Sequence, residues 1–600
     1  ATSSACTLVI RASCVFVRSE PVSCSTRALL DSGWVCGARR WAPNGTEFAA
    51  FLGVPYAKQP LGELRFQELQ QVEPWDVIDA TKEGPVCPQR DVFYGRIMQP
   101  KDMGEACIHA NVYVPIHALP PPYQTGVGND DDLIKKGPGL PIFVFIHGGG
   151  FTFGSGDPDL YGPENLVTQD VIVITFNYRL NVFGFLSLNN SYIPGNNGLR
   201  DMVMLLRWVQ TNAHSFGGNP DDVTLAGHSA GAASAHLLSL SDAAEGLFKR
   251  VLLMSGTALP TFYTTSPTYA QFVSTMFLNE LAINSTDAEN IHRQLVTMPL
   301  DKIMAAHNKM QDLFGIAVFY PVVESPFPNF TTVLDDDPEA LLAKGQGKNI
   351  PLMIGFTNAE CYGFVPRFKE IDILGTVKAN PVILAPLHLI YRRPPKVAMD
   401  IARRIQARYF YGESTIDQYV KSCSDSYFLY PAMKVAQMRA MVGGAPVYMY
   451  EFSYQSDVSI KKFVDKLDYK GAGHLEDVTY LFRVNSILGA EDTFKRTKND
   501  EAIKDWMVQF VRNFIRCSFA TPWPSFTKYD MMYQGINMPF YRTLELNSKQ
   551  LEMTIVEWHK YFLSVYYDHF PQPKEVFCTS VHREGAEDDS GFLQDICYRF

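Results

Sequence analysis

One serine in this 600-residue chain stands between small residues in a pattern that is typical of an exposed nucleophile. The stretch "FGGNPDDVTLAGHSAG" ends at residues 227–231, which read G-H-S-A-G and fit G-x-S-x-G around Ser229. A short apolar run precedes it and an alanine-rich stretch follows, so we expect a strand, a sharp turn and a helix. Such a turn lifts the serine hydroxyl clear of the backbone. Ser229 is the candidate nucleophile, and a tight turn with an incidental serine is the alternative.

A serine hydroxyl is a weak nucleophile at neutral pH and needs a general base that an acid orients. In chains with this turn, the order is serine, acid, histidine. Of the histidines after Ser229, His474 lies in a Gly-flanked loop, "KGAGHLEDVTYLF", that is suited to delivering a side chain at the edge of a sheet. His236 lies in the serine's own helix, where its side chain cannot easily swing back. The histidines expected to be ordinary surface or core residues are His292, His307, His559 and His569.

The acid has several candidates. Glu360 follows an apolar strand in "PLMIGFTNAECYGF", and catalytic residues of open α/β sheets gather at the carboxyl ends of strands. Glu324 and Asp335 compete with it. By local pattern alone, Glu360 is equally well a solvated surface glutamate.

A tetrahedral oxyanion needs backbone N–H donors, each of which lowers the barrier by about 3 kcal/mol. The stretch "IHGGGFTFGSG" follows an expected strand and carries three consecutive glycines, which let backbone amides approach a ligand closely. It fits an oxyanion loop, and the residue after the nucleophile, Ala230, adds another amide. A phosphate-binding loop is the weaker alternative, because no Lys-Ser/Thr pair follows.

Strand-like and helix-like stretches alternate around these residues. Two continuous apolar runs fit strands that are covered on both faces. Such alternation predicts an α/β fold with a mostly parallel sheet. The expected strands are 140–147, 170–179, 222–227, 250–256 and 350–358, and the expected helices are 198–216 and 230–241.

Composition excludes some classes of protein. The chain is 46% hydrophobic and 19% charged, a balance typical of globular proteins. Its net charge of -10 argues against nucleic-acid binding, which needs a clustered basic surface. No apolar run reaches the roughly 18 residues of a transmembrane helix.

The 11 cysteines show no metal-type spacing. Glycosylation sequons begin at Asn44, Asn189, Asn284 and Asn329.

Taken together, these motifs resemble the type-B carboxylesterases, the cholinesterase and carboxylesterase family on the α/β-hydrolase fold, and most of all the insect members. The likeness covers about residues 30–570 and includes "FLGVPYAKQPLGELRF", "HGGGF", "NYRLNVFGFLS" and "GNNGLRD". It implies an α/β-hydrolase domain at 29–571, with a large mostly parallel sheet and helices on both faces. An extension of unknown role would precede it at 1–28, and a polar, flexible tail would follow at 572–600.

The resemblance implies ester hydrolysis in two steps: the serine takes the acyl group, and water then releases the acid. No metal and no organic cofactor is implied. It also implies a monomer or weak homodimer acting on a small-molecule ester. The implied site residues are Ser229 (nucleophile), Glu360 (acid), His474 (base), and Gly149, Gly150 and Ala230 (oxyanion hole).

Other family features are partly kept. The resemblance pairs Cys87 with Cys107 and places Ser255 near the triad, where a buried structural hydroxyl is the alternative reading. Cys423 matches a family cysteine, but its usual partner position is Met or Thr, near residues 553–554. No tryptophan stands between Cys87 and Cys107 to bind a quaternary ammonium, so acetylcholine is not the expected substrate.

We expect an esterase for small to medium lipophilic esters, such as odorant, xenobiotic or hormone esters, with an apolar acyl pocket. His228 before the nucleophile favours a general insect esterase, because insect esterases specific for a hormone usually carry glutamine there. A non-catalytic neuroligin-like adhesion homologue and a stoichiometric scavenger of esters or organophosphates are the alternatives. The sequons and Cys87–Cys107 favour secretion, with a cytoplasmic location as the alternative.

Overall fold

The structure is a computed structural model. It describes residues 24–93, 101–120, 139–259, 263–385, 390, 394–459, 467, 469–484, 496–518, 525–527 and 534–536, with the backbone of 576–579 and 596–599. His559, His569, residues 553–554 and most of the expected extension and tail lie outside these ranges.

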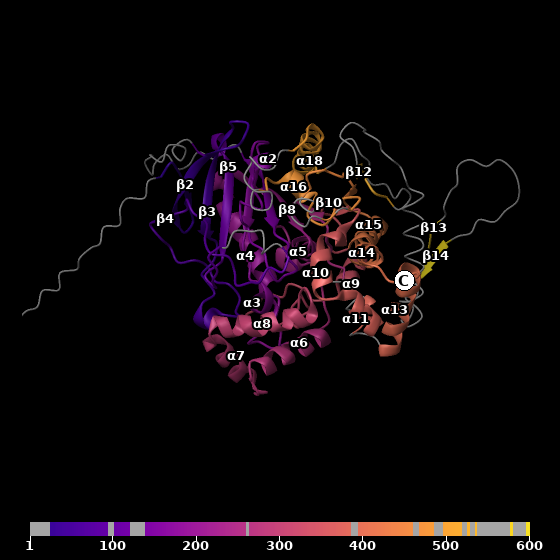
Figure 1. The fold of residues 1–600 in the computed structure, drawn as a ribbon. Coiled ribbons are helices and arrows are strands. Elements are labelled where there is room, and N and C mark those ends of the chain that lie inside the picture. Colours follow the sequence, from indigo (N-terminus) through magenta and orange to yellow (C-terminus); the bar gives the residue numbers. More distant parts are fainter. Residues whose placement is uncertain are drawn as a thin grey trace, which may run out of the picture.

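A twelve-stranded sheet runs through the molecule in the order β1-β2-β3-β5-β7-β6-β8-β9-β10-β11-β12, with β4 paired to β2 (Figure 1). The strands are β1 (Thr26–Leu30), β2 (Gly33–Trp41), β3 (Glu47–Pro55), β4 (Val77–Asp79), β5 (His109–Pro115), β6 (Leu140–Ile146), β7 (Ile172–Phe176), β8 (Gly218–His228), β9 (Arg250–Met254), β10 (Leu352–Thr357), β11 (Val447–Phe452) and β12 (Gln534–Ile536). From β7 to β12 every neighbouring pair is parallel. From β1 to β7 the neighbouring pairs in this order are antiparallel, whereas β4 pairs with β2 in parallel. A separate antiparallel pair joins β13 (Val576–Thr579) and β14 (Ile596–Arg599).

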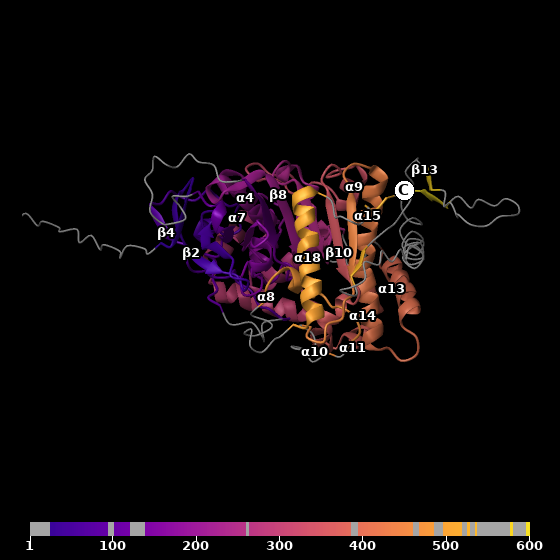
Figure 2. The ribbon, with the colours of Figure 1, turned by 90° about the horizontal axis from the view of Figure 1, so that it is seen from above.

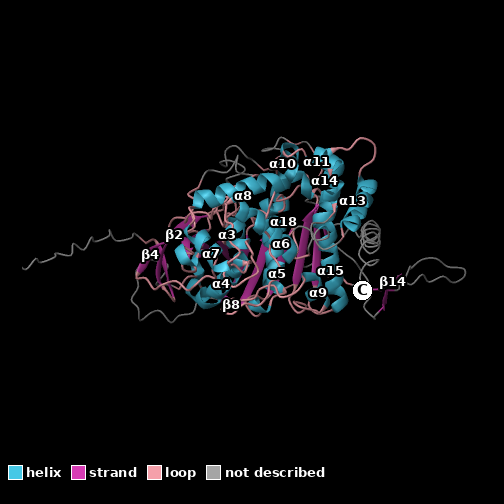
Figure 3. Cartoon of the chain, turned by 90° about the horizontal axis from the view of Figure 1, so that it is seen from below, coloured by secondary structure: helices cyan, strands magenta, loops and turns pink. Residues whose placement is uncertain are grey.

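Helices cover both faces of this sheet (Figures 2 and 3). They are α2 (Glu164–Val167), α3 (Asn181–Phe185), α4 (Asn197–Asn212), α5 (Ala230–Ser239), α6 (Pro267–Glu280), α7 (Ala288–Thr297), α8 (Leu300–Phe314), α9 (Pro338–Ala343), α10 (Val365–Glu370), α11 (Ile373–Ala379), α13 (Pro395–Tyr409), α14 (Ile416–Ser424), α15 (Tyr430–Val442), α16 (Val478–Leu481) and α18 (Lys498–Cys517). A helical turn at Glu360–Phe364, η6, follows β10.

The apolar run of β6 explains why both faces are covered. Successive side chains of a strand point to opposite faces. Val144 belongs to the core that contains α4 and α5, whereas its neighbours Phe143 and Phe145 belong to the core that contains α16 and α18. A strand that is apolar on both faces is stable only between two layers of helices.

The sequence-based expectations for this region are confirmed. Each of the five expected strands contains or overlaps an observed strand, from β6 to β10, and the sheet is mostly parallel. The expected helices correspond to α4, which continues into a short helical turn, and α5. The first strand begins at Thr26, inside the range expected to be an extension.

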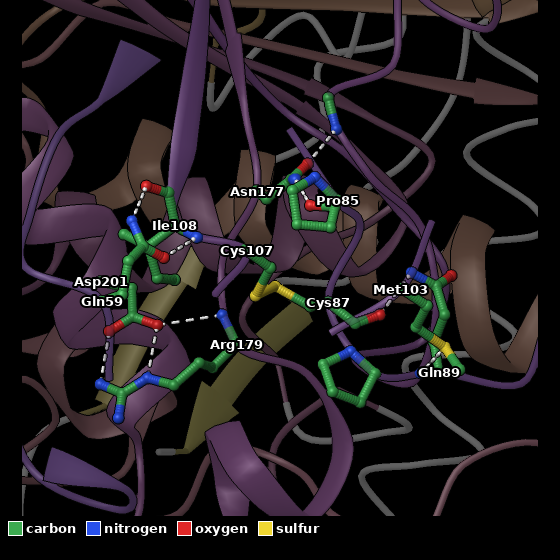
Figure 4. The surroundings of a disulfide bond; sticks show 12 residues. Gln59, Pro85, Cys87, Gln89, Met103, Cys107, Ile108, Asn177, Arg179 and Asp201 are labelled. Atoms are coloured by element: carbon green, nitrogen blue, oxygen red, sulfur yellow. Dashed lines mark hydrogen bonds and ion pairs between the residues drawn. A yellow bond between two sulfur atoms is a disulfide. The ribbon is translucent and has the colours of Figure 1, made fainter. Parts of the chain in front are cut away.

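The disulfide between Cys87 and Cys107 is present, with a Cα–Cα distance of 4.9 Å (Figure 4). Beside it in the same view, the buried Asp201 carboxylate accepts hydrogen bonds from the backbone and guanidinium of Arg179. Two further disulfides, Cys24–Cys36 and Cys361–Cys423, were not expected from the sequence. Across the described ranges, no helix combines the length and the apolar character that crossing a membrane requires.

Candidate active site

Ser229 stands at the joint between β8 and α5, as the sequence predicted. Its backbone has φ 57° and ψ −122°, a strained conformation for a residue with a side chain. The turn can be this tight because Gly231 has no Cβ; one would lie 2.1 Å from the carbonyl oxygen of Ile146. The Ser229 N–H donates to the Met254 carbonyl across 2.8 Å, which fixes the turn against β9.

Glu360 lies just past the carboxyl end of β10, at the start of η6. Its side chain is buried, and its Oε1 accepts a hydrogen bond of 2.7 Å from the Thr357 N–H. Burial raises the pKa of the Glu360 carboxyl to about 7, although the Thr357 N–H and the nearby Ser255 hydroxyl act in the opposite direction. Ser255 therefore lies near the carboxylate, as the family resemblance implied.

His474 meets Glu360 directly. The Nδ1 of His474 lies 2.6 Å from Oε2 of Glu360, and the His474 N–H donates to the Glu360 carbonyl across 3.1 Å. A further backbone hydrogen bond of 3.0 Å joins Ala359 to Ala472. Two backbone hydrogen bonds thus join the loop after β10 to the loop after β11, and the side-chain pair lies between these loops.

Aromatic rings enclose the His474 imidazole. The ring centroids of His228, Phe428 and Phe364 lie 4.4, 5.0 and 5.1 Å from that of His474. Burial, with a smaller effect of His474, holds the pKa of His228 well below its usual range, so His228 is neutral at physiological pH. The imidazole of His474 can move little in this enclosure.

The competing candidates have other roles. Glu324 pairs with the guanidinium of Arg200 and accepts hydrogen bonds from two backbone N–H groups. Asp335 is exposed. His236 is buried and accepts a hydrogen bond of 3.0 Å from the Ala258 N–H through its Nδ1. The structure therefore groups Glu360 and His474, not these residues, near the serine.

The glycine loop follows β6 and lies against the serine turn. Gly149 has φ 107°, and a Cβ there would lie 2.0 Å from the Phe153 carbonyl oxygen, so only glycine fits. Gln89 holds the far end of the loop, because it donates to the carbonyl and accepts from the N–H of Gly154. Ala230 is the first residue of α5, where backbone N–H groups lack an intrahelical acceptor.

These groups share one cavity of about 290 Å³, which Ser229, His474, Gly149 and Gly150 all line. Such a volume is at the small end of the range for small-molecule sites. Apolar side chains line much of the cavity, among them Phe93, Met103, Phe153, Leu160, Ile316 and Phe364, and the polar side chains Gln89, Asp91, Lys101 and Asp157 line it as well. Within the described part of the chain, no group of three His, Cys, Asp or Glu side chains could hold a metal ion.

Tyr263 also lines the cavity, and no sequence motif pointed to it. Its hydroxyl lies 3.0 Å from Oγ of Ser229, and this is the hydrogen bond that the serine hydroxyl makes in the structure. Burial raises the pKa of the Tyr263 phenol above its usual range, so the phenol stays protonated. Only the folded chain brings this side chain to the serine.

The Cys361–Cys423 disulfide anchors the acid-bearing turn. Cys361 follows Glu360 directly, and the bridge joins η6 to α14. The Cys361 N–H also donates to the Ser424 hydroxyl across 3.0 Å. Cys423, whose usual family partner position lies outside the described residues, thus has a partner next to the buried carboxylate.

Comparisons with known proteins show the family to which the chain belongs. The model of the Carboxylesterase family matches residues 24–554. "Juvenile hormone esterase" of Heliothis virescens is 50% identical over 555 residues, which cover 91% of this chain and 95% of that protein. "Esterase FE4" of Myzus persicae is 32% identical over 507 residues, 81% of this chain and 83% of that one. The crystal structure of juvenile hormone esterase from Manduca sexta, with OTFP covalently attached, superposes with a TM-score of 0.83 at 49% identity, covering 90% of this chain and 99% of that one.

Removing the Cys361–Cys423 bridge with paired alanine substitutions should lower the free energy of unfolding by about 4 kcal/mol, because the bridge closes a loop of 62 residues. The matched control removes Cys24–Cys36, which closes 12 residues and should cost about 3 kcal/mol. Thermal unfolding and ester hydrolysis would be measured on both. If the variant without Cys361–Cys423 kept its activity while the control lost activity, the anchoring role would be contradicted.

Proposed function

The chain belongs to the carboxylesterase family, and we propose that it hydrolyses esters through a triad of Ser229, His474 and Glu360. The observation that carries this proposal is the 2.6 Å hydrogen bond between His474 and the buried Glu360, at the wall of the cavity that Ser229 also lines. A buried carboxylate beside an imidazole sets its tautomer and stabilises the imidazolium that forms during catalysis.

In the proposed reaction, Oγ of Ser229 attacks the ester carbonyl while Nε2 of His474 takes the serine proton. The N–H groups of Gly149, Gly150 and Ala230 receive the oxyanion. His474 then protonates the departing alcohol, which leaves an acyl-enzyme. Water attacks the acyl carbon with His474 as base, and the acid and the free serine are regenerated.

The apolar cavity supports lipophilic esters as substrates. We further propose that a juvenile hormone is among them, because the Heliothis virescens and Manduca sexta proteins that this chain resembles at 50% and 49% identity are juvenile hormone esterases. His228 stands where, from the sequence analysis, a hormone-specific insect esterase is expected to carry glutamine. This proposal therefore gives the likeness of the whole chain more weight than that one position.

We also propose that the protein is secreted. Three disulfides lie within the described residues, and disulfides persist in oxidising compartments. All four sequon asparagines are exposed: Asn44, Asn189, Asn284 and Asn329.

Replacing the nucleophile tests the triad. Ser229→Ala should lower kcat for p-nitrophenyl butyrate by several orders of magnitude, because the remaining residues cannot form an acyl-enzyme. A Ser255→Ala variant, which leaves the nucleophile in place, is the control and should keep substantial activity. Equal activity of wild type and Ser229→Ala would mean that another residue is the nucleophile. A folded wild type without activity would favour a binding protein.

The rate should fall as the pH drops through about 7. Burial raises the pKa of Glu360 to about 7, and below that pH the Glu360–His474 pair binds a proton and loses its basic form. The acid limb of kcat/KM for p-nitrophenyl butyrate measures this midpoint. His228→Gln should leave the midpoint unchanged, since His228 is already neutral. If the midpoint moved by a full pH unit in His228→Gln, the acid limb would not report the Glu360–His474 pair.

Substrate preference tests the apolar pocket. Values of kcat/KM for p-nitrophenyl esters should rise from acetate to butyrate, because each buried methylene adds about 0.8 kcal/mol of binding. A juvenile hormone should compete with p-nitrophenyl butyrate and be hydrolysed with a higher kcat/KM. A steady fall from acetate to octanoate would contradict the pocket, and hormone that neither competes nor reacts would contradict the hormone proposal.

Peptide mapping of the native protein tests secretion. Cys87 and Cys107 should be recovered as a linked pair, and glycosidase treatment should shift the mass of peptides that contain the sequons. Free thiols at both positions together with unmodified asparagines would place the protein in the cytosol.

A further inference from the structure

We propose that Tyr263 is a catalytic residue that speeds the second half of the reaction, the release of the acyl group from Ser229. The proposal rests on the acyl-enzyme mechanism proposed above. Its geometric basis is the 3.0 Å contact between the Tyr263 hydroxyl and Oγ of Ser229, both of which line the cavity. The contact is made by the reacting oxygen itself.

The tyrosine is held firmly in this position. Its side chain is buried, and its ring meets those of Phe151 and Phe428 edge-on, at centroid distances of 6.2 and 6.4 Å. Phe151 belongs to the glycine loop, and Phe428 also packs on His474. The phenol is therefore positioned by the same elements that position the oxyanion loop and the base.

Either hydroxyl could donate across this distance, and we infer that the phenol is the donor. A phenol O–H is more acidic than an aliphatic alcohol, and Tyr263 remains protonated in its buried site. When Tyr263 donates to Oγ, the proton of Ser229 stays available for His474. The bond is thus compatible with attack by the serine.

The strength of this hydrogen bond changes during the cycle. In the free enzyme Oγ is a hydroxyl oxygen and a good acceptor. In the acyl-enzyme it is an ester oxygen whose lone pair is delocalised into the carbonyl, and it accepts weakly. During deacylation the oxygen of water forms a bond to the acyl carbon, the bond from that carbon to Oγ breaks, and His474 returns a proton to Oγ.

Tyr263 therefore stabilises the free serine and the departing Oγ more than the acyl-enzyme. Its hydroxyl should speed deacylation. It should leave the rate of acylation almost unchanged, because Oγ is a good acceptor both in the free enzyme and in the transition state of acylation. The expected effect is that of one neutral hydrogen bond, about three- to tenfold in rate.

The test compares wild type with Tyr263→Phe, which removes the hydroxyl and keeps the ring. With p-nitrophenyl butyrate the leaving group is good, acylation is fast and deacylation limits kcat. We expect kcat and KM to fall by the same factor, three to ten, with kcat/KM unchanged within twofold. Intact-mass measurement after rapid acid quenching should show more butyryl-enzyme at steady state and slower loss of the adduct after substrate is exhausted.

The matched control is Tyr320→Phe. Tyr320 is also buried and its ring also faces Phe151, but its hydroxyl donates to the Ala317 carbonyl. This variant should keep the wild-type kcat and adduct lifetime. The adduct lifetime is measured only on molecules that have been acylated, so a smaller folded fraction of either variant does not alter it.

The outcomes separate the two proposals. A wild-type adduct lifetime in Tyr263→Phe, or a kcat/KM that falls together with kcat, would overturn the role of Tyr263. Absence of any adduct in active wild type, or an adduct that persists in Ser229→Ala, would overturn the acyl-enzyme mechanism instead.

Discussion

The site depends on one buried hydrogen bond, that between Glu360 and His474. A carboxylate without water is costly, and its elevated pKa shows that cost. Hydrogen bonds from the Thr357 N–H and the imidazole to the carboxylate offset it, and a backbone hydrogen bond between the same two residues holds the pair in place. The rings of His228, Phe364 and Phe428 pack against the imidazole. The loops after β10 and β11 can vary little without losing this contact.

The sheet determines where that pair lies relative to Ser229. In a parallel sheet, the carboxyl ends of neighbouring strands lie at one edge. Ser229 follows β8, Glu360 follows β10, and the glycine loop follows β6, which pairs with β8. Residues separated by more than 200 positions thus reach one cavity because their strands are near neighbours in the order β6-β8-β9-β10.

Much of this arrangement could be predicted, because it is encoded locally. The serine turn, the triple glycine and the apolar strands each have a signature within about ten residues. The choice of Glu360 over Glu324 could not be made locally, since both follow apolar segments and both are buried. What separates them is a partner far along the chain, Arg200 for Glu324 and His474 for Glu360. The contact of Tyr263 with Ser229 escaped prediction for the same reason.

The Cys361–Cys423 bridge has a consequence for the life of the chain in the cell. Its two cysteines tie the turn that carries Glu360 to α14, and such a bridge forms only where thiols are oxidised. A newly made chain in a reducing compartment would have its serine turn, which needs no covalent support, before its acid was tethered. Oxidation would then be the step that tethers the turn carrying Glu360, and under the proposed secretion this tether would form during export rather than at synthesis.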